Sequence, residues 1–330
     1  MINKLITREQ RKPELQLSHE QQNIKVENHK ASLLAWFDSS ANLGSDNSRF
    51  SWLRISPFIA IHLSVLLVFW VGFSWIALAA CALLYFIRMF AITAFYHRYF
   101  SHKSFKTSRF FQFVFAFIGA MSAQRGPLWW ASHHRVHHAC SDSPEDPHSP
   151  KHKGSLWSHM LWFLTNENFA TREEKISDFS RYPELRWLDR FEIVAPAFLI
   201  LMLFLTGEYL ANSYQGSSTS GLQMVVWGFC ISTVILYHAT YTINSLAHRF
   251  GKRRFQTKDD SRNNFWLALL TLGEGWHNNH HYYATCARQG FAWYEIDISY
   301  YILKLLAVFG IVTDLKPVPA RIKKQIRGEF

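Results

Sequence analysis

Long apolar runs constrain this chain more than any other feature, because a segment that crosses a bilayer must satisfy its own backbone hydrogen bonds as a helix. The first run extends from about residue 55 to residue 94, interrupted mainly by Arg88. Since about 20 residues span the hydrocarbon core, this run predicts two spans, at about 55–72 and 75–94. Later runs predict spans at about 191–205 and 222–243, joined by a Gly- and Ser-rich segment at 206–221. The sequence therefore predicts an all-α integral membrane protein with four transmembrane helices.

Hydrophilic segments separate these runs and predict large soluble parts. Although 49% of the 330 residues are hydrophobic, the mean hydropathy is only -0.06. We expect a polar N-terminal leader over residues 1–50, one membrane domain over 51–315 and a basic tail over 316–330. Within the leader, an apolar patch at 31–37 suits an interfacial helix.

Two shorter apolar stretches also predict helices. Residues 105–118 are rich in phenylalanine and suit either a helix along the membrane surface or a buried packing helix. Residues 296–312 suit an amphipathic helix.

Positive charge predicts the orientation of the spans. Apart from Arg88, the other 34 of the 35 Lys and Arg residues lie before the first span, between residues 95 and 190, or after residue 248. By the positive-inside rule, both termini and the central hydrophilic block are expected in the cytoplasm. The formal charge of +11 favours contact with an anionic membrane or an acidic partner protein, and no nucleic-acid-binding motif accompanies it.

Histidines are clustered in three motifs within the hydrophilic segments. The motifs are HRYFSH at 97–102, HHRVHH at 133–138 and HNNHH at 277–281. A single histidine run can be a loose metal-scavenging tract, but three clusters with related spacing favour a built metal site. The four cysteines are scattered without a CxxC pair, which argues against a cysteine zinc site or a disulfide framework.

The spacing within the motifs predicts how the side chains point. On a helix, positions i, i+3 and i+4 share a face, so His134, His137 and His138 are expected to point the same way. A step of five residues turns a helix by about 140°. We therefore expect His97 to end a helix and His102 to lie in the turn after it.

A further histidine, His248, lies near the cytoplasmic end of the fourth span, where Asn244 shares its helical face. The nine candidate ligands are His97, His102, His134, His137, His138, His248, His277, His280 and His281. Since one metal ion rarely takes more than about six ligands, nine imidazoles predict two ions, and imidazole suits Zn, Cu, Fe and Ni. A dinuclear site at a membrane surface favours oxidation of an apolar substrate with O2.

This motif set resembles the membrane fatty-acid desaturases of the stearoyl-CoA Δ9 type, whose histidine pattern is HxxxxH, HxxHH and HxxHH. Three neighbouring short motifs are also similar to those of this family: EDPH at 145–148, NSLAH at 244–248 and GEGW at 273–276. The resemblance covers about residues 50–315, and not the leader. It implies a desaturase with a cytoplasmic helical cap that holds two Fe ions (Fe2+/Fe3+). Such an enzyme uses O2 as co-substrate to insert a cis double bond, at Δ9, into a saturated acyl-CoA of about 16–18 carbons.

The resemblance also implies roles for individual residues. The nine histidines bind the two irons, and Asn244 reaches one iron through water. Positions that line the substrate tunnel are matched by Tyr85, Met89, Gln124, Trp130, Thr240 and Tyr241. Tyr85 and Met89 match the closed end, and the other four match the bend. Histidines without a ligand counterpart are His62, His133, His148, His159 and His238.

Two of the tunnel positions depart from the family pattern. Tyr241 stands where a family member has tryptophan. Met89 stands where a small residue accommodates an eighteen-carbon chain, so a preference nearer sixteen carbons is expected.

The carrier of the acyl chain stays open between acyl-CoA and acyl-lipid. Animal acyl-CoA enzymes have an Arg-Asp pair where this chain has Ser132 and His133, and Gly126 and Pro127 are more similar to bacterial and plastid relatives. The basic residues 151–153 could still bind CoA phosphates, or be an ordinary basic loop.

Electrons are expected from an external donor, either a ferredoxin or a cytochrome b5-like protein. The sequence contains no HPGG haem-binding motif, no CxxC-rich segment of a ferredoxin and no glycine-rich dinucleotide-binding motif. Two other functions compete with desaturation. A membrane fatty-acid hydroxylase uses related chemistry, and a non-catalytic metal-binding or transport protein would place ionisable ligands along its spans.

Overall fold

The computed structural model describes residues 38–39, 50–214 and 219–329. The apolar patch predicted at 31–37, and most of the leader, lie outside the described residues. Within them the fold is helical, and the one sheet pairs β1 (Lys106–Thr107) with β2 (Val312–Thr313) in antiparallel register. The prediction of an all-α architecture is therefore confirmed.

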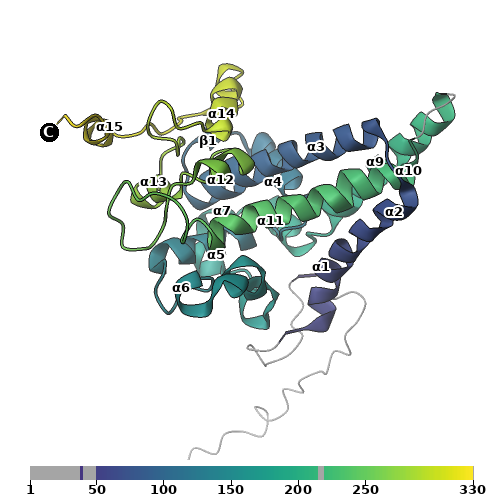
Figure 1. Ribbon diagram of the computed structural model, residues 1–330, viewed down its shortest axis with the longest axis horizontal. Coiled ribbons are helices and arrows are strands. Elements are labelled where there is room, and N and C mark those ends of the chain that lie inside the picture. Colours follow the sequence, from purple (N-terminus) through teal and green to yellow (C-terminus); the bar gives the residue numbers. More distant parts are fainter. Residues whose placement is uncertain (1–37, 40–49, 215–218, 330) are drawn as a thin grey trace, which may run out of the picture.

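Four helical segments are long and apolar enough to cross a membrane, and they form the bundle in Figure 1. They are Arg54–Val71, Trp75–Ser101, Val194–Ser213 and Gly221–Ser245. The first contains α1 (Trp52–Ser64), η3 (Val65–Leu67) and α2 (Val68–Val71), and the second contains α3 (Trp75–Phe90) and the π-helix η4 (Ala91–Ser101). The third is α9 (Val194–Ser213), and the fourth contains α10 (Gly221–Val225), the π-helix η9 (Val226–Ile231) and α11 (Ser232–Ser245).

The third span is longer than its apolar run predicts, and its last turns occupy part of the segment expected to be a linker. The Thr206 hydroxyl donates to the Met202 carbonyl at 2.7 Å, and the Asn212 amide donates to the Glu208 carbonyl at 2.9 Å. These polar side chains form hydrogen bonds with backbone carbonyls of the same helix, so they do not end the helix.

The two short connections between spans lie together at one end of the bundle. The Ser74 and Thr219 hydroxyls are 2.6 Å apart, and the Trp227 indole donates to the Gly72 carbonyl at 2.9 Å. Gly72 has φ 68°, a left-handed conformation that glycine adopts without strain. These contacts fix the tight turn between the first and second spans.

Arg88 is fully buried within the second span and is paired inside the bundle. Its guanidinium donates to the Thr233 hydroxyl at 2.7 Å, the Ser232 hydroxyl at 2.8 Å and the Met121 carbonyl at 3.1 Å. A buried cation needs such donors satisfied. Arg88 therefore ties α3 to α11 and is part of the packing.

The remaining helices form a cap at the opposite end of the bundle, with α5, α6, α12 and α13 gathered over the ends of the spans (Figure 1). The α-helices of this part are α4 (Arg109–Ala120), α5 (Pro127–Cys140), α6 (Pro150–Lys153), α7 (Ser177–Ser180), α8 (Pro183–Arg190), α12 (Phe265–Leu270), α13 (His277–Tyr282), α14 (Ile298–Val308) and α15 (Ala320–Arg327). Shorter turns are η5 (Trp157–Leu161), η6 (Trp162–Leu164), η7 (Asn166–Asn168) and η8 (Glu173–Lys175).

Both of the shorter apolar stretches form helices. α4 buries one face, which includes Gln112 and Ala116, and leaves Phe110 exposed. α14 buries Ser299 and Leu303 and exposes Leu305 and Val308. Each helix therefore combines a packing face with an apolar face that is open to its surroundings.

The second span does not end at His97, as the five-residue spacing predicts. It continues as the π-helix η4 to Ser101, and His102 follows it directly. A π-helix closes i→i+5 hydrogen bonds, so residues five apart come to the same side of the helix. The His97 and His102 rings consequently lie with their centroids 5.0 Å apart. The prediction that the helix ends at His97 was wrong because it assumed α-helical geometry, whereas the prediction that His102 lies in the turn after the helix is confirmed.

Helix α5, which carries the HHRVHH motif, begins at a buried carboxylate from α8. Asp189 Oδ1 accepts hydrogen bonds from the backbone N–H groups of Leu128 at 3.0 Å and Trp129 at 2.8 Å. Gly126 passes so close that an added Cβ would lie 2.2 Å from Asp189 Oδ1. A negative charge at a helix N-terminus is favourable, so Asp189 fixes where α5 starts.

Candidate metal centre

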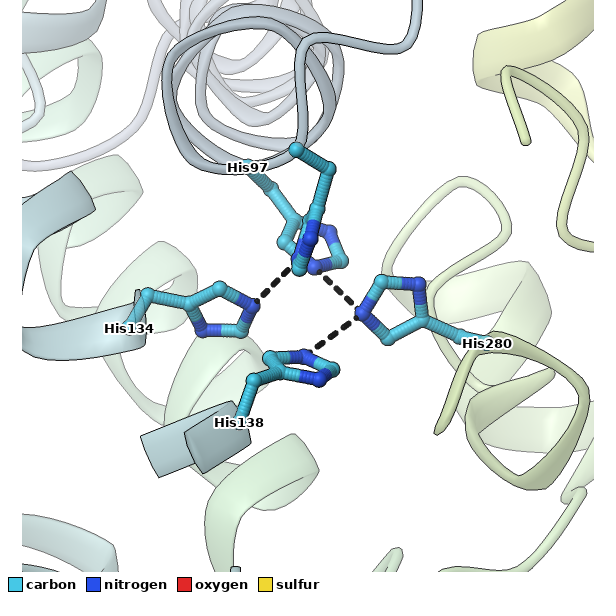
Figure 2. A group of neighbouring side chains, drawn as sticks. His97, His134, His138 and His280 are labelled. Atoms are coloured by element: carbon cyan, nitrogen blue, oxygen red, sulfur yellow. Dashed lines mark hydrogen bonds between the residues drawn. The ribbon is translucent and has the colours of Figure 1, made fainter. Parts of the chain in front are cut away.

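Nine histidines from four segments converge in the cap, and Figure 2 shows four of them with their rings directed toward one another. Each can offer one ring nitrogen within 4.8 Å of the others in its group. The first group is His97, His102, His134, His138 and His280. The second group is His137, His248, His277 and His281. The structure thus brings together all nine histidines that the sequence singled out.

Helix α5 contributes to both groups. His134 and His138, four residues apart, belong to the first group, whereas His137 belongs to the second. Consecutive residues on an α-helix point about 100° apart, so His137 and His138 diverge. The shared face predicted for α5 is therefore divided between two sites.

The spacing of the ring nitrogens in the first group fits a shared metal ion. The Nε2 atom of His280 lies 2.9 Å from Nε2 of His97 and 2.9 Å from Nε2 of His138. A ring nitrogen carries one proton or one lone pair, so one Nε2 cannot make two full hydrogen bonds. Two imidazole nitrogens at right angles on one ion, each ~2.1 Å from it, lie about 3.0 Å apart.

The ring nitrogens of the second group are also spaced to share a metal ion. His248 Nε2 and His277 Nε2 are 3.0 Å apart, and His281 Nε2 is buried with no hydrogen-bond partner among the described residues. Leaving a buried polar atom unpaired costs about 1–3 kcal/mol. A bound ion would remove that cost, so this group also fits a metal.

Carboxylates hold the opposite ring nitrogen, Nδ1, of four of these histidines. The pairs are His137 with Asp146 at 3.0 Å, His248 with Asp142 at 2.8 Å, His281 with Asp259 at 2.7 Å, and His97 with Glu274. A carboxylate at Nδ1 fixes the tautomer and leaves Nε2 free to bind a metal.

Glu274 belongs to a buried network that extends behind the first group. The Arg98 guanidinium lies 3.0 Å from Glu274 Oε1 and 2.9 Å from Asp297 Oδ1. Gln289 donates to Glu274 Oε2 at 2.9 Å, and its amide nitrogen is 3.3 Å from His97 Nδ1. Because Asp297 also caps the N-terminus of α14, this network joins the histidines to that helix.

Burial favours the neutral form of six of the nine imidazoles, whereas Asp146 raises the pKa of the buried His137 above the ordinary value. Burial and the neighbouring rings lower the pKa of five histidines well below the ordinary value: His102, His134, His138, His277 and His280. Burial likewise lowers the pKa of His281 to about 4, despite Asp259. Burial alone would raise the pKa of Asp142, but hydrogen bonds from His248 and from the backbone lower it to about 2. Neutral imidazole is the form that binds metals.

The other histidines serve different contacts. His238 is hydrogen-bonded on both sides, 3.3 Å from His62 and 3.0 Å from His159, as expected for a packed histidine. His133 pairs with the Ala170 carbonyl at 3.1 Å. His148 stacks on His137 at 4.3 Å and forms, with Asp146, a third group that overlaps the second.

Two cavities adjoin the histidines. The larger, about 470 Å³, reaches His134 and Asn244, and its lining includes Gln124, Trp130, Thr240 and Tyr241. The smaller, about 40 Å³, lies against both histidine groups and is lined by Met89, Trp130, Thr240 and Asn244. Five of the six predicted tunnel residues therefore line a cavity.

Tyr85 is the exception among the predicted tunnel residues. It lines neither cavity, and its hydroxyl donates to the Leu270 carbonyl at 2.6 Å. Its aromatic ring packs against the core beside Met89.

Sequence reasoning missed the partners of the histidines. Asp142, Asp259 and Gln289 carry no motif of their own and lie up to 192 residues from a ring they contact. The available signal was weak, namely an acidic residue four positions after His138 and another beyond His248.

A family model described as fatty acid desaturase matches residues 73–307 of this chain. The chain is 37% identical over 281 residues to Delta-9 acyl-lipid desaturase 2 of Arabidopsis thaliana, which covers 84% of this chain and 86% of that protein. It is 34% identical over 275 residues to the sn-1 stearoyl-lipid 9-desaturase of Anabaena variabilis, covering 82% and 96%. It is 36% identical over 257 residues to the acyl-CoA C20 Delta5-desaturase of Anemone leveillei, covering 77% and 78%.

Asp259→Asn is expected to weaken metal binding by about 10–100-fold, because the carboxylate that orients His281 and raises its basicity is lost. Metal retained per chain against a competing chelator, measured by mass spectrometry, checks this. The control is Asp260→Asn, whose carboxylate pairs with Lys151 and Arg253 at the surface. Equal metal retention in the two variants would contradict the role of Asp259.

Proposed function

The chain belongs to the fatty acid desaturase family, a family of di-iron oxidoreductases, and we propose that it inserts a cis double bond, at Δ9, into a saturated acyl chain of about 16–18 carbons. One observation carries the proposal: two groups of buried or half-buried imidazoles lie against a small, largely apolar cavity that adjoins a larger one. A metal transporter would instead need ligands along its spans, and the grouped histidines lie at their ends.

The reaction removes two hydrogen atoms from adjacent methylenes of the acyl chain. O2 takes up these two hydrogens together with two electrons and two protons from outside, and leaves as two molecules of water. When bound, two irons supply the activation of O2, which no side chain can provide. The donor set supports them, since imidazole with carboxylate behind it suits iron.

The protein's own residues bind the irons and position the acyl chain. We assign the nine histidines as ligands of the two irons, and Asn244, which borders both cavities, as a ligand through water. Gln124 donates to the Thr240 hydroxyl at 3.1 Å where the cavities approach each other, and Trp130 lines both. Since one methylene resembles the next, holding the chain at these residues selects the bond that reacts.

Electrons come from an external carrier in this proposal, and the cap faces the cytoplasm. Helix α15 supports an acidic carrier such as a ferredoxin or a cytochrome b5-like protein. It packs Ile322 inward, exposes Lys323 and Lys324, and lies on the side of the cap farthest from the spans (Figure 1). Beneath α15, the ring of Tyr282, the residue after His281, stacks on the ring of Phe255 with their centroids 4.1 Å apart.

His138→Ala is expected to abolish desaturation, because the first group loses a ring nitrogen that lies 2.9 Å from His280. Gas chromatography with mass spectrometry of host lipids checks for a new cis-monounsaturated acid that vanishes in the variant. Lys304→Ala, at an exposed position of α14 outside both histidine groups, is the control. A hydroxy acid would assign the chain to hydroxylation, and no new product from iron-loaded protein with a working donor would refute an oxidative function.

Met89→Ala is expected to shift the preferred chain from about sixteen toward eighteen carbons. Met89 is fully buried and borders the small cavity beside the histidines, so its truncation lengthens the space available to the methyl end. Chain-length profiles of the products check this. Tyr85→Phe, which changes a residue that lines neither cavity, should leave the profile unchanged, and an unchanged profile in Met89→Ala would place the closed end elsewhere.

Replacing Lys323 and Lys324 by Glu is expected to slow turnover with an acidic ferredoxin at least tenfold at low salt, with a smaller difference at high salt. The same double change at Lys151 and Lys153 alters the net charge equally on another surface. Product formed with dithionite as reductant should be equal in both variants. Equal slowing of the two by ferredoxin would show that α15 is not the docking face.

A further inference from the structure

The larger cavity opens on the membrane-spanning helices. Among the described residues that line it, the exposed ones are Pro57 and Ala60 on α1 and Ala197 on α9. The lining residues on the cap side are buried or half-buried, among them Trp129 and Trp162. The open wall of the cavity is therefore formed by two spans, between α1 and α9.

This opening lies at the depth of lipid acyl chains. Arg54 begins the first span, and Ala60 lies six residues further along the helix, about 9 Å deeper at 1.5 Å per residue. The hydrocarbon core of a bilayer is about 30 Å thick. Ile61 and Ile200 continue the apolar lining from the two helices. A lipid chain beside the protein would meet an apolar opening at its own level.

Polar groups lie where a lipid head group would remain. Arg54 and Arg125 both approach the ring of Phe169, at 3.6 and 3.7 Å from its centroid, and Arg125 also pairs with Glu192 at 2.9 Å. All four residues line the cavity at the interfacial end of the spans. Guanidinium groups at this level suit the ester and phosphate oxygens of a glycerolipid.

The basic loop that could bind CoA phosphates is not at this opening. Lys151, His152 and Lys153 do not line the cavity. Lys151 pairs with Asp260 at 3.4 Å, and the His152 ring lies 2.9 Å from the Asp142 carbonyl oxygen. These contacts favour the reading of residues 151–153 as an ordinary basic loop.

We propose that the substrate is an acyl chain esterified in a membrane glycerolipid, which enters the cavity sideways from the bilayer between α1 and α9. The head group stays at the interface beside Arg54 and Arg125, while the chain runs past Trp130 and Thr240 toward the histidines. This proposal rests on the proposed function, because it names the carrier of the chain that is desaturated.

The carrier is tested with iron-loaded protein in vesicles, given a reductant and either phosphatidylcholine with an isotopically labelled palmitoyl chain or labelled palmitoyl-CoA. Labelled monounsaturated product is then measured separately in the glycerolipid and CoA fractions. We expect product in the glycerolipid and none in the CoA fraction. Product formed only on CoA overturns the proposal and leaves desaturation standing. No product on either carrier, from iron-loaded reduced protein, overturns desaturation itself.

The route is tested by filling the opening. Ala197→Trp and Ala60→Trp are expected to slow desaturation of the labelled glycerolipid at least tenfold with iron content unchanged. Ala211→Trp is the matched control, since Ala211 is exposed on the same helix and does not line the cavity. If the tryptophan variants lose iron, Ala197→Leu is used, with a smaller loss expected. Wild-type rates in folded, iron-loaded Ala197→Trp and Ala60→Trp would overturn lateral access.

Discussion

The rest of the structure depends on packing nine buried or half-buried imidazoles within a few ångströms of one another. Burial and the neighbouring rings favour the neutral form of most of these imidazoles, and their unpaired nitrogens need a partner. Carboxylates provide that partner at Nδ1 for four rings, and they are tied to further segments in turn. Asp142, for example, contacts His248 and also accepts the backbone N–H of Asp260 at 2.8 Å. The loops of the cap are thus arranged around the rings they orient.

Two local features deliver the histidines from different parts of the chain to this centre. The second span continues as a π-helix, which carries His97 and Arg98 out of the bundle and turns His102 toward the same side. Helix α5 begins at the buried carboxylate of Asp189, which sets the position of every histidine after it. A shift of either helix by one residue would move its rings away from the others.

The two cavities lie between the histidine groups and the membrane-spanning helices. Trp130, Thr240 and Asn244 border both cavities, so the cavity that opens on the spans adjoins the smaller one beside the two histidine groups. Selecting one bond in a saturated chain requires position, because the methylenes do not differ chemically. The helices that wall the two cavities supply that position, and the fold thereby relates membrane location to chemistry.

Hydropathy and motif spacing are local properties of the chain, so they were enough to predict four membrane helices and to single out the nine histidines. Tertiary structure decided how the histidines divide, since the divergence of His137 from His138 has a meaning only once other segments surround α5. It also decided the π-helical conformation from His97 to Ser101, where α-helical periodicity predicted the end of the helix wrongly. The partners Asp142 and Asp259 were likewise hidden, because contacts across many residues leave no periodic signal. The opening at Ala60 and Ala197 depends on how two spans pack, which hydropathy along one helix does not specify.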